Sequence, residues 1–110
     1  MNNTPITAEE CYAALIRALG NLPNVTQWQK KSFGSAGLSI HDKIFAMLLK
    51  GKLVIKLPQE RVNALIERQV GERFKLGQKY MQEWVTLEPM PEEGWLDLSR
   101  EAMEFVDSKR

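Results

Sequence analysis

The sequence is poor in the residues that form covalent and metal cross-links, with one cysteine, Cys11, and one histidine, His41. A single cysteine cannot close a disulfide within its own chain. Structural zinc sites need a full tetrahedral set of ligands, which these two residues cannot supply. We therefore expect a fold held together by its hydrophobic core, with no metal and no cofactor.

Long apolar runs are also missing. No window approaches the roughly 18 uninterrupted apolar residues of a membrane-spanning helix. The beginning, MNNTPITAEE, lacks the basic and apolar regions of a signal peptide. We expect a cytoplasmic protein that has no membrane partner.

The size and composition indicate one globular domain. The chain has 110 residues, of which 44% are hydrophobic and 26% are charged. This length suffices for one hydrophobic core but not for two ordinary ones. We predict a single domain over residues 1–110 with an ordered core over residues 7–106.

Charge is unevenly distributed along the chain, although the formal net charge is only +1. Residues 26–56 hold six lysines and one acidic residue, Asp42, whereas residues 82–107 hold eight acidic residues and one basic residue, Arg100. The first segment is therefore able to attract an anion, and the second either neutralises it or faces elsewhere.

Three segments carry the signals of helices. Thr7 and Glu10 have the spacing of a capping box, and an apolar stripe follows at helical spacing. Pro58 suits the first turn of a second helix that ends near Gly71. A third apolar stripe predicts a helix over residues 95–106. The first stripe consists of Cys11, Tyr12, Leu15, Ile16 and Leu19.

Five segments favour strands, because they are rich in β-favouring residues or alternate between apolar and polar ones. Turns at Asp42-Lys43 and at Lys50-Gly51-Lys52 separate three of them, and residues 74–80 are expected to form a loop. The predicted strands are 25–31, 38–41, 44–49, 53–57 and 83–87. The order α-β-β-β-β-α-β-α predicts an α+β fold, a two-layer sandwich of three helices on an antiparallel sheet of about five strands.

The strand over residues 44–49 is apolar on both faces. Ile44, Ala46 and Leu48 are expected to point to one side, so their neighbours must point to the other. If all three helices lie on one side, an apolar patch stays open for a second chain or another protein. Alternatively, the terminal helix crosses over and covers this patch within the monomer. The predicted partner or dimer face consists of Phe45, Met47, Leu49 and Val54.

Lysines in and around the strands suggest a second possible surface. Lys30, Lys31, Lys50 and Lys52 are candidates for contacts with nucleic-acid phosphates. The alternative is a solvated strand edge, where lysine discourages aggregation. The glycines of GSAG at residues 34–37 precede a predicted strand rather than a helix, so we interpret this step as a turn and not as a phosphate-binding loop.

Lys56 differs from the other lysines because it lies inside a predicted strand. It is a candidate ligand-binding point together with Glu83, if their two strands are neighbours. A structural ion pair is the alternative interpretation. His41 beside Asp42 fits a hairpin tip better than a catalytic pair, and Cys11 fits the apolar stripe. We therefore predict no catalytic residue and no enzyme.

The ordered motifs resemble the N-terminal domain of the bacterial TfoX/Sxy family. The matching positions are Phe33-Gly34, Gly37-Leu38, Lys43-Ile44-Phe45-Ala46, Gly51-Lys52-Leu53, Ile55-Lys56-Leu57, Gly71, Phe74, Glu83-Trp84-Val85 and Ala102. YjbR-like proteins are the more distant alternative. The resemblance implies a fold similar to that of secretion chaperones and implies no established catalytic residue.

The sequence thus predicts a non-catalytic binding or regulatory module of the TfoX N-terminal type, which acts through protein contacts and as a possible homodimer. Two alternatives stay open. One is a weak nucleic-acid-binding module that uses the lysines of the strand region, and the other is a small-molecule-binding domain around Lys56 and Glu83.

Overall fold

The computed structural model of the protein describes residues 7–30, 35–90 and 92–109. Over these residues the chain forms three helices and six strands. The helices are α1 (Ala8–Leu19), α2 (Gln59–Glu67) and α3 (Glu92–Ser108). The strands are β1 (Val25–Lys30), β2 (Ser35–Ile40), β3 (Lys43–Leu49), β4 (Lys52–Lys56), β5 (Glu72–Leu76) and β6 (Lys79–Leu87).

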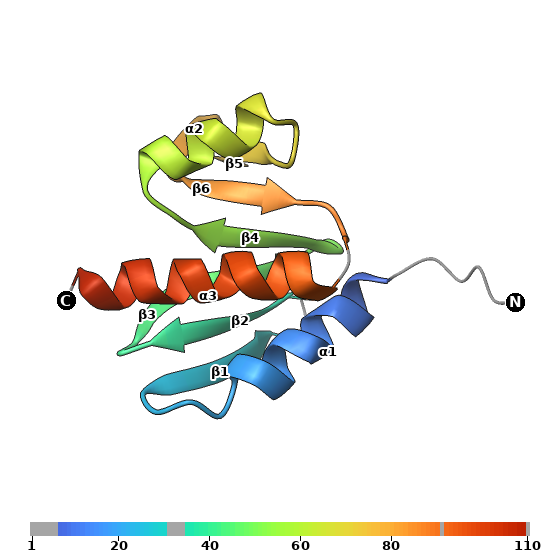
Figure 1. Ribbon diagram of the computed structural model, residues 1–110, viewed down its shortest axis with the longest axis vertical. Helices are drawn as coiled ribbons and strands as arrows, with labels where there is room; N and C mark the ends of the chain where they lie inside the picture. The colour runs from blue at the N-terminus through green and yellow to red at the C-terminus, as the bar shows by residue number, and fades with distance from the viewer. Residues whose placement is uncertain (1–6, 31–34, 91, 110) are drawn as a thin grey trace, which may run out of the picture.

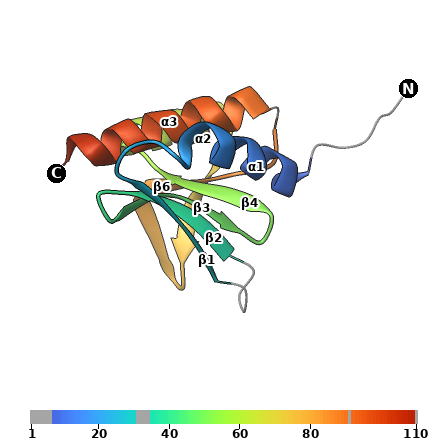
Figure 2. The same cartoon turned by 90° about the horizontal axis from the view of Figure 1, so that it is seen from below.

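All six strands form one antiparallel sheet in the order β1-β2-β3-β4-β6-β5. The three helices lie on one side of this sheet, as the edge-on view in Figure 2 shows. In Figure 1, α3 runs along the middle of the sheet, α1 packs beside α3, and α2 lies next to β6 and β5. The predicted two-layer α+β architecture is confirmed.

The strand β5 overlaps the region predicted as a loop, and it raises the strand count to six. The strand β6 also begins earlier than predicted, at Lys79. It sits at the edge of the sheet, where β6 is its one partner strand. Charged residues make up much of this strand, Glu72, Arg73 and Lys75, and its register with β6 shifts between Arg73 and Lys75. An edge strand buries few of its side chains, so it shows little of the alternation by which a strand is recognised.

Two tight turns join the three central hairpin strands. His41 and Asp42 connect β2 to β3 with positive φ angles of 49° and 66°. Lys50 and Gly51 connect β3 to β4 with φ angles of 50° and 77°. Two consecutive residues with positive φ are typical of the turn whose twist matches that of paired strands. The sequence predicted the first turn at Asp42-Lys43, but the turn lies one residue earlier, at His41-Asp42.

The first two helices begin where the sequence indicates, whereas α3 begins at Glu92, before the predicted start at Trp95. All three helices enclose one core against the sheet. Thr7 caps α1, since its hydroxyl accepts a hydrogen bond of 3.1 Å from the backbone N–H of Glu10. Pro58 precedes α2. On α3, Trp95 is fully buried, and its indole N–H donates to the carbonyl of Glu88 at 2.9 Å. Burying the ring and satisfying its one polar group anchors α3 to the end of β6.

A β-bulge in β3 changes which of its residues point into the core, compared with the prediction. Leu38 pairs with Ala46 and Ser39 pairs with Ile44, so Phe45 is an extra residue without a partner on β2. The bulge puts Phe45 and Ala46 together in the core, where neither is exposed. The prediction that Phe45 belongs to an open partner face is therefore wrong. Strict alternation fails here because a bulge adds one residue to one strand only.

The opposite face of the sheet carries no helix among the residues that the structure describes (Figure 2). The alternative in which the terminal helix crosses over is thus excluded, since α3 packs on the same side as α1 and α2. We call this uncovered side the open face. It contains every second residue of β4, namely Lys52, Val54 and Lys56, because Leu53 and Ile55 belong to the core.

Candidate functional site

A row of directly paired residues crosses the open face over all six strands. Each residue of this row is the register partner of the next one. Its centre is apolar, and Gly37 is the one position without a side chain. From β1 to β5 the row consists of Trp28, Gly37, Met47, Val54, Thr86 and Glu72.

The indole ring of Trp28 covers the gap that Gly37 leaves. A Cβ atom placed on Gly37 would lie 2.2 Å from a carbon of this ring, closer than two atoms can approach. Glycine is therefore required here, because the aromatic ring packs directly on the neighbouring backbone. This cross-strand pairing of an aromatic residue with a glycine stabilises strand register and extends the apolar surface to β1.

The accessible part of the open face is smaller than the predicted set suggests. Met47 and Leu49 are half-buried, whereas only 1% of Val54 is exposed. Val54 is enclosed by the side chains around it and offers little surface to a partner. Ile44 takes the outward position that was predicted for Phe45, and 38% of it is exposed. The apolar contact surface thus centres on Met47, Leu49 and Ile44.

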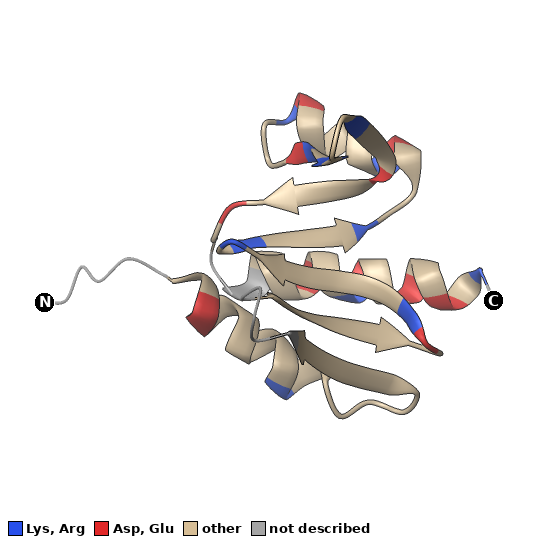
Figure 3. Cartoon of the chain, turned by 180° about the vertical axis from the view of Figure 1, so that it is seen from behind, with Lys and Arg blue, Asp and Glu red and all other residues tan. Residues whose placement is uncertain are grey.

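Charges on the open face are largely compensated within the chain. The ammonium of Lys52 lies 2.9 Å from a carboxylate oxygen of Glu88. Hydrogen bonding to Glu88 and the charge of Glu88 raise the pKa of Lys52. The ammonium of Lys56 lies 5.7 Å from the ring centre of Trp84, its register partner on β6, in a cation–π contact. Viewed from behind, β3 and β4 carry charged residues only at their ends, and β2 carries none (Figure 3).

The four lysines predicted as a nucleic-acid face do not form one described surface. Lys50 is exposed in the turn between β3 and β4, whereas Lys52 is paired with Glu88. Lys31 lies outside the described residues, and so does the side chain of Lys30. A phosphate-binding surface needs several uncompensated cations in a row, and Lys50 alone does not provide it.

Lys56 and Glu83 lie on neighbouring strands, as the candidate ligand point requires, and both line a shallow hollow of about 360 Å³. Their charged groups nevertheless have different partners. Lys56 lies over Trp84, while Glu83 forms an ion pair of 3.7 Å with Lys109 near the end of α3. These contacts favour the structural interpretation of both residues.

The remaining polar candidates also have structural partners. His41 Nε2 lies 3.3 Å from a carboxylate oxygen of Asp107 on α3, which ties the first hairpin turn to the last helix. Cys11 is fully buried, and its thiol donates to the carbonyl of Met90 at 3.1 Å. Within the described ranges, no group of acidic, histidine and cysteine side chains could hold a metal ion, and no helix is long and apolar enough to cross a membrane.

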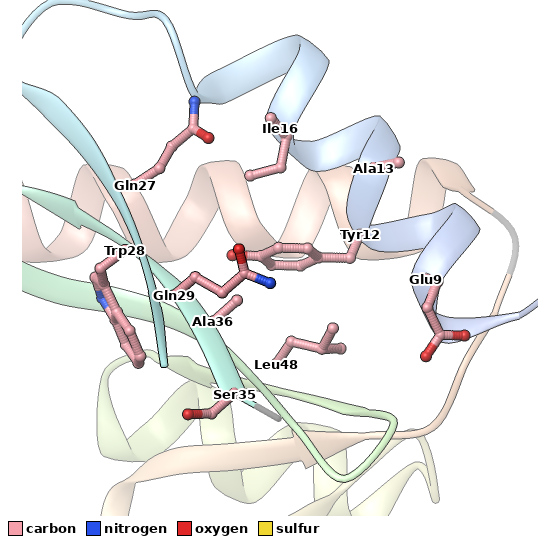
Figure 4. A pocket seen from close by; sticks show the side chains of 10 residues that line it. All are labelled: Glu9, Tyr12, Ala13, Ile16, Gln27, Trp28, Gln29, Ser35, Ala36 and Leu48. Atoms are coloured by element: carbon pink, nitrogen blue, oxygen red, sulfur yellow. The ribbon is translucent and has the colours of Figure 1, made fainter. Parts of the chain in front are cut away.

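One cavity was not predicted from the sequence. It measures about 740 Å³ and lies between α1 and the strands β1, β2 and β3. Tyr12 reaches into it from α1 toward Gln29 and Ala36 (Figure 4). Tyr12 lies on the buried stripe of α1, as its spacing predicted. The cavity depends on the distance between that helix and the sheet, which no sequence pattern specifies.

No protein-family model, curated protein or solved structure matches this chain. The resemblance to the TfoX/Sxy N-terminal domain therefore stays a prediction that depends on its ordered motifs. Function has to be inferred from the open face and the cavity.

Proposed function

We propose that this protein is a non-catalytic binding module that pairs with a second copy of itself through the open face of the sheet. The observation that carries the proposal is the placement of all three helices on one side, while apolar residues occupy both sides. Met47, Leu49 and Ile44 gain most from a partner, since they stay partly exposed in the described chain.

A second copy fits this face better than a nucleic acid does. A nucleic acid needs several uncompensated positive charges in a row, but Lys52 is paired with Glu88, which leaves Lys56, over the neutral ring of Trp84, as an isolated cation on β4. Two apolar sheet faces, in contrast, pack well against each other at a spacing of about 10 Å. In a two-fold dimer each copy contributes the same surface, so one apolar patch is sufficient.

Two-fold symmetry doubles the effect of any substitution in the interface. Met47 lies in the middle of the open-face row, directly opposite Val54. Met47→Asp puts one carboxylate from each copy into an apolar contact, where a charge is strongly unfavourable. We expect dimerisation to weaken by roughly 100-fold, about tenfold for each carboxylate.

Sedimentation equilibrium over a range of concentrations tests this expectation. The wild type is expected to approach twice the chain mass as concentration rises, and Met47→Asp to stay near one chain mass. Leu76→Asp is the matched control, because Leu76 is 62% exposed at the end of β5, away from the centre of the open-face row. Circular dichroism checks that each variant is folded. A wild type that stays monomeric at high concentration, or an equal loss in both variants, contradicts the proposal.

A further inference from the structure

The cavity under α1 combines apolar walls with a few polar groups. The walls come from Ala13 and Ile16 of α1, Ala36 of β2 and Leu48 of β3 (Figure 4). Its volume of about 740 Å³ lies within the range of small-molecule sites. Such sites are mainly apolar and use a small number of polar groups to orient the ligand.

Tyr12 provides a polar group that has no partner. The residue is only 9% exposed, and its hydroxyl makes no hydrogen bond to any part of the chain that the structure describes. A buried hydroxyl without a partner is unfavourable, and such groups are rare in folded proteins. The hydroxyl is protonated at neutral pH, and burial raises the pKa of Tyr12 further, to about 12. It is therefore able to donate a hydrogen bond.

The lining also restricts the charge of a ligand. Among the described lining residues, Glu9 is the one charged side chain, and no lysine, arginine or histidine is present. An anionic ligand would therefore meet no compensating cation from these residues. The amide of Gln29 adds a neutral polar group on the strand side, whereas the hydroxyl of Ser35 points away from Tyr12 (Figure 4).

We infer that this cavity binds an uncharged, mainly apolar small molecule whose carbonyl or similar acceptor takes a hydrogen bond from the Tyr12 hydroxyl. The apolar walls supply the contact area, and the buried hydroxyl supplies the orientation. This site lies on the helix side of the sheet, so the inference does not depend on the proposed dimer.

Two probes of similar size test the role of the hydroxyl. Acetophenone carries a carbonyl acceptor on an apolar ring, and ethylbenzene lacks the acceptor. Each is titrated into the ¹⁵N-labelled protein while amide resonances are followed. We expect both to shift amides of Tyr12, Ile16 and Ala36, and acetophenone to bind about fivefold more tightly, the gain typical of one hydrogen bond.

Tyr12→Phe removes the hydroxyl and keeps the ring. We expect the fivefold preference for acetophenone to disappear in this variant. Tyr80→Phe is the matched control, because Tyr80 is 56% exposed on β6 and lies outside the cavity lining. The preference is expected to stay unchanged in this control.

Thermal unfolding without a probe provides a second readout. If the hydroxyl has no partner in solution, Tyr12→Phe raises the melting temperature, because an unfavourable buried group is removed. A lower melting temperature shows that the hydroxyl is already hydrogen-bonded, and it overturns the inference. The inference is also overturned if acetophenone leaves the amide resonances of the cavity residues unshifted at millimolar concentration. A Tyr12→Phe variant that still prefers acetophenone to ethylbenzene overturns it as well.

Discussion

The two faces of the sheet differ in what covers them, although the strands supply apolar side chains to both. On the helix side, Leu53 and Ile55 of β4 are fully buried under the helices. On the open side, Val54 of the same strand is almost as deeply buried, but by neighbouring strand residues and not by a helix. Side-chain burial alone thus does not distinguish a covered face from an uncovered one.

The difference lies in the residues around the buried position. Met47 and Leu49 on the open side are half-buried and are left without a covering layer by the described chain. Lys52 and Lys56 lie on either side of Val54 along β4 and keep this face compatible with water. The open face therefore has the properties of a surface that is stable in the monomer and still gains from a partner.

The largest expected effect tests which side of the sheet Phe45 belongs to. Phe45→Ala removes a fully buried ring, and we expect it to lower the free energy of unfolding by about 3–5 kcal/mol. Ile44→Ala is the matched control at the next position, where exposure makes the loss smaller. Urea unfolding measures both. If Ile44→Ala lowers the free energy of unfolding as much as Phe45→Ala does, the two residues do not lie on opposite faces of the sheet.

A smaller effect is expected at the other end of the open face. Gly37→Ala forces the Trp28 ring to move, and overpacking of this kind costs about 1–3 kcal/mol. The same substitution in a Trp28→Ala background is expected to cost less, since the ring is then absent. Urea unfolding of the wild type, the two single variants and the double variant gives the coupling free energy between Gly37 and Trp28. If Gly37→Ala lowers the free energy of unfolding equally in both backgrounds, the ring of Trp28 does not lie on Gly37.

The smallest effect concerns the charge pair on the open face. Glu88 raises the pKa of Lys52 above its usual value of 10.5, so the pair stabilises the fold below that pH, and the contribution is lost as the pH rises through the raised pKa. We expect Glu88→Gln to lower the pKa of Lys52 toward 10.5, as measured by an NMR titration of its side chain. Glu104→Gln removes the same charge from α3 and serves as control. A pKa that does not change in Glu88→Gln shows that the pair is absent in solution.

Much of the fold follows from local signals in the sequence. The Thr7 cap, the apolar stripes of the helices and the glycine turn at Gly51 each depend on residues close together in the chain. The features that sequence analysis missed depend on contacts between distant segments. The bulge at Phe45 is set by pairing with β2, and β5 is recognisable mainly by its pairing with β6.

The candidate site shows the same division. Alternation along β4 correctly places Val54 on the side opposite to the core, but only the packing of its neighbours reveals that it is nearly inaccessible. Likewise, the adjacency of the strands of Lys56 and Glu83 was only a condition of the prediction, which the pairing of β4 with β6 meets. The competing partners Trp84 and Lys109 were not predicted. Side-chain partners depend on rotamers and on the approach of α3, which a linear pattern does not encode.

Intermolecular nuclear Overhauser effects test the central claim most directly. A sample that mixes isotope-labelled and unlabelled copies reports only contacts between two chains. We predict contacts from the Met47 methyl group of one copy to Met47, Leu49 or Ile44 of the other. Contacts that involve only the exposed hairpin residues Leu76 and Tyr80, or no contacts at all at concentrations where the mass doubles, would contradict pairing through the open face.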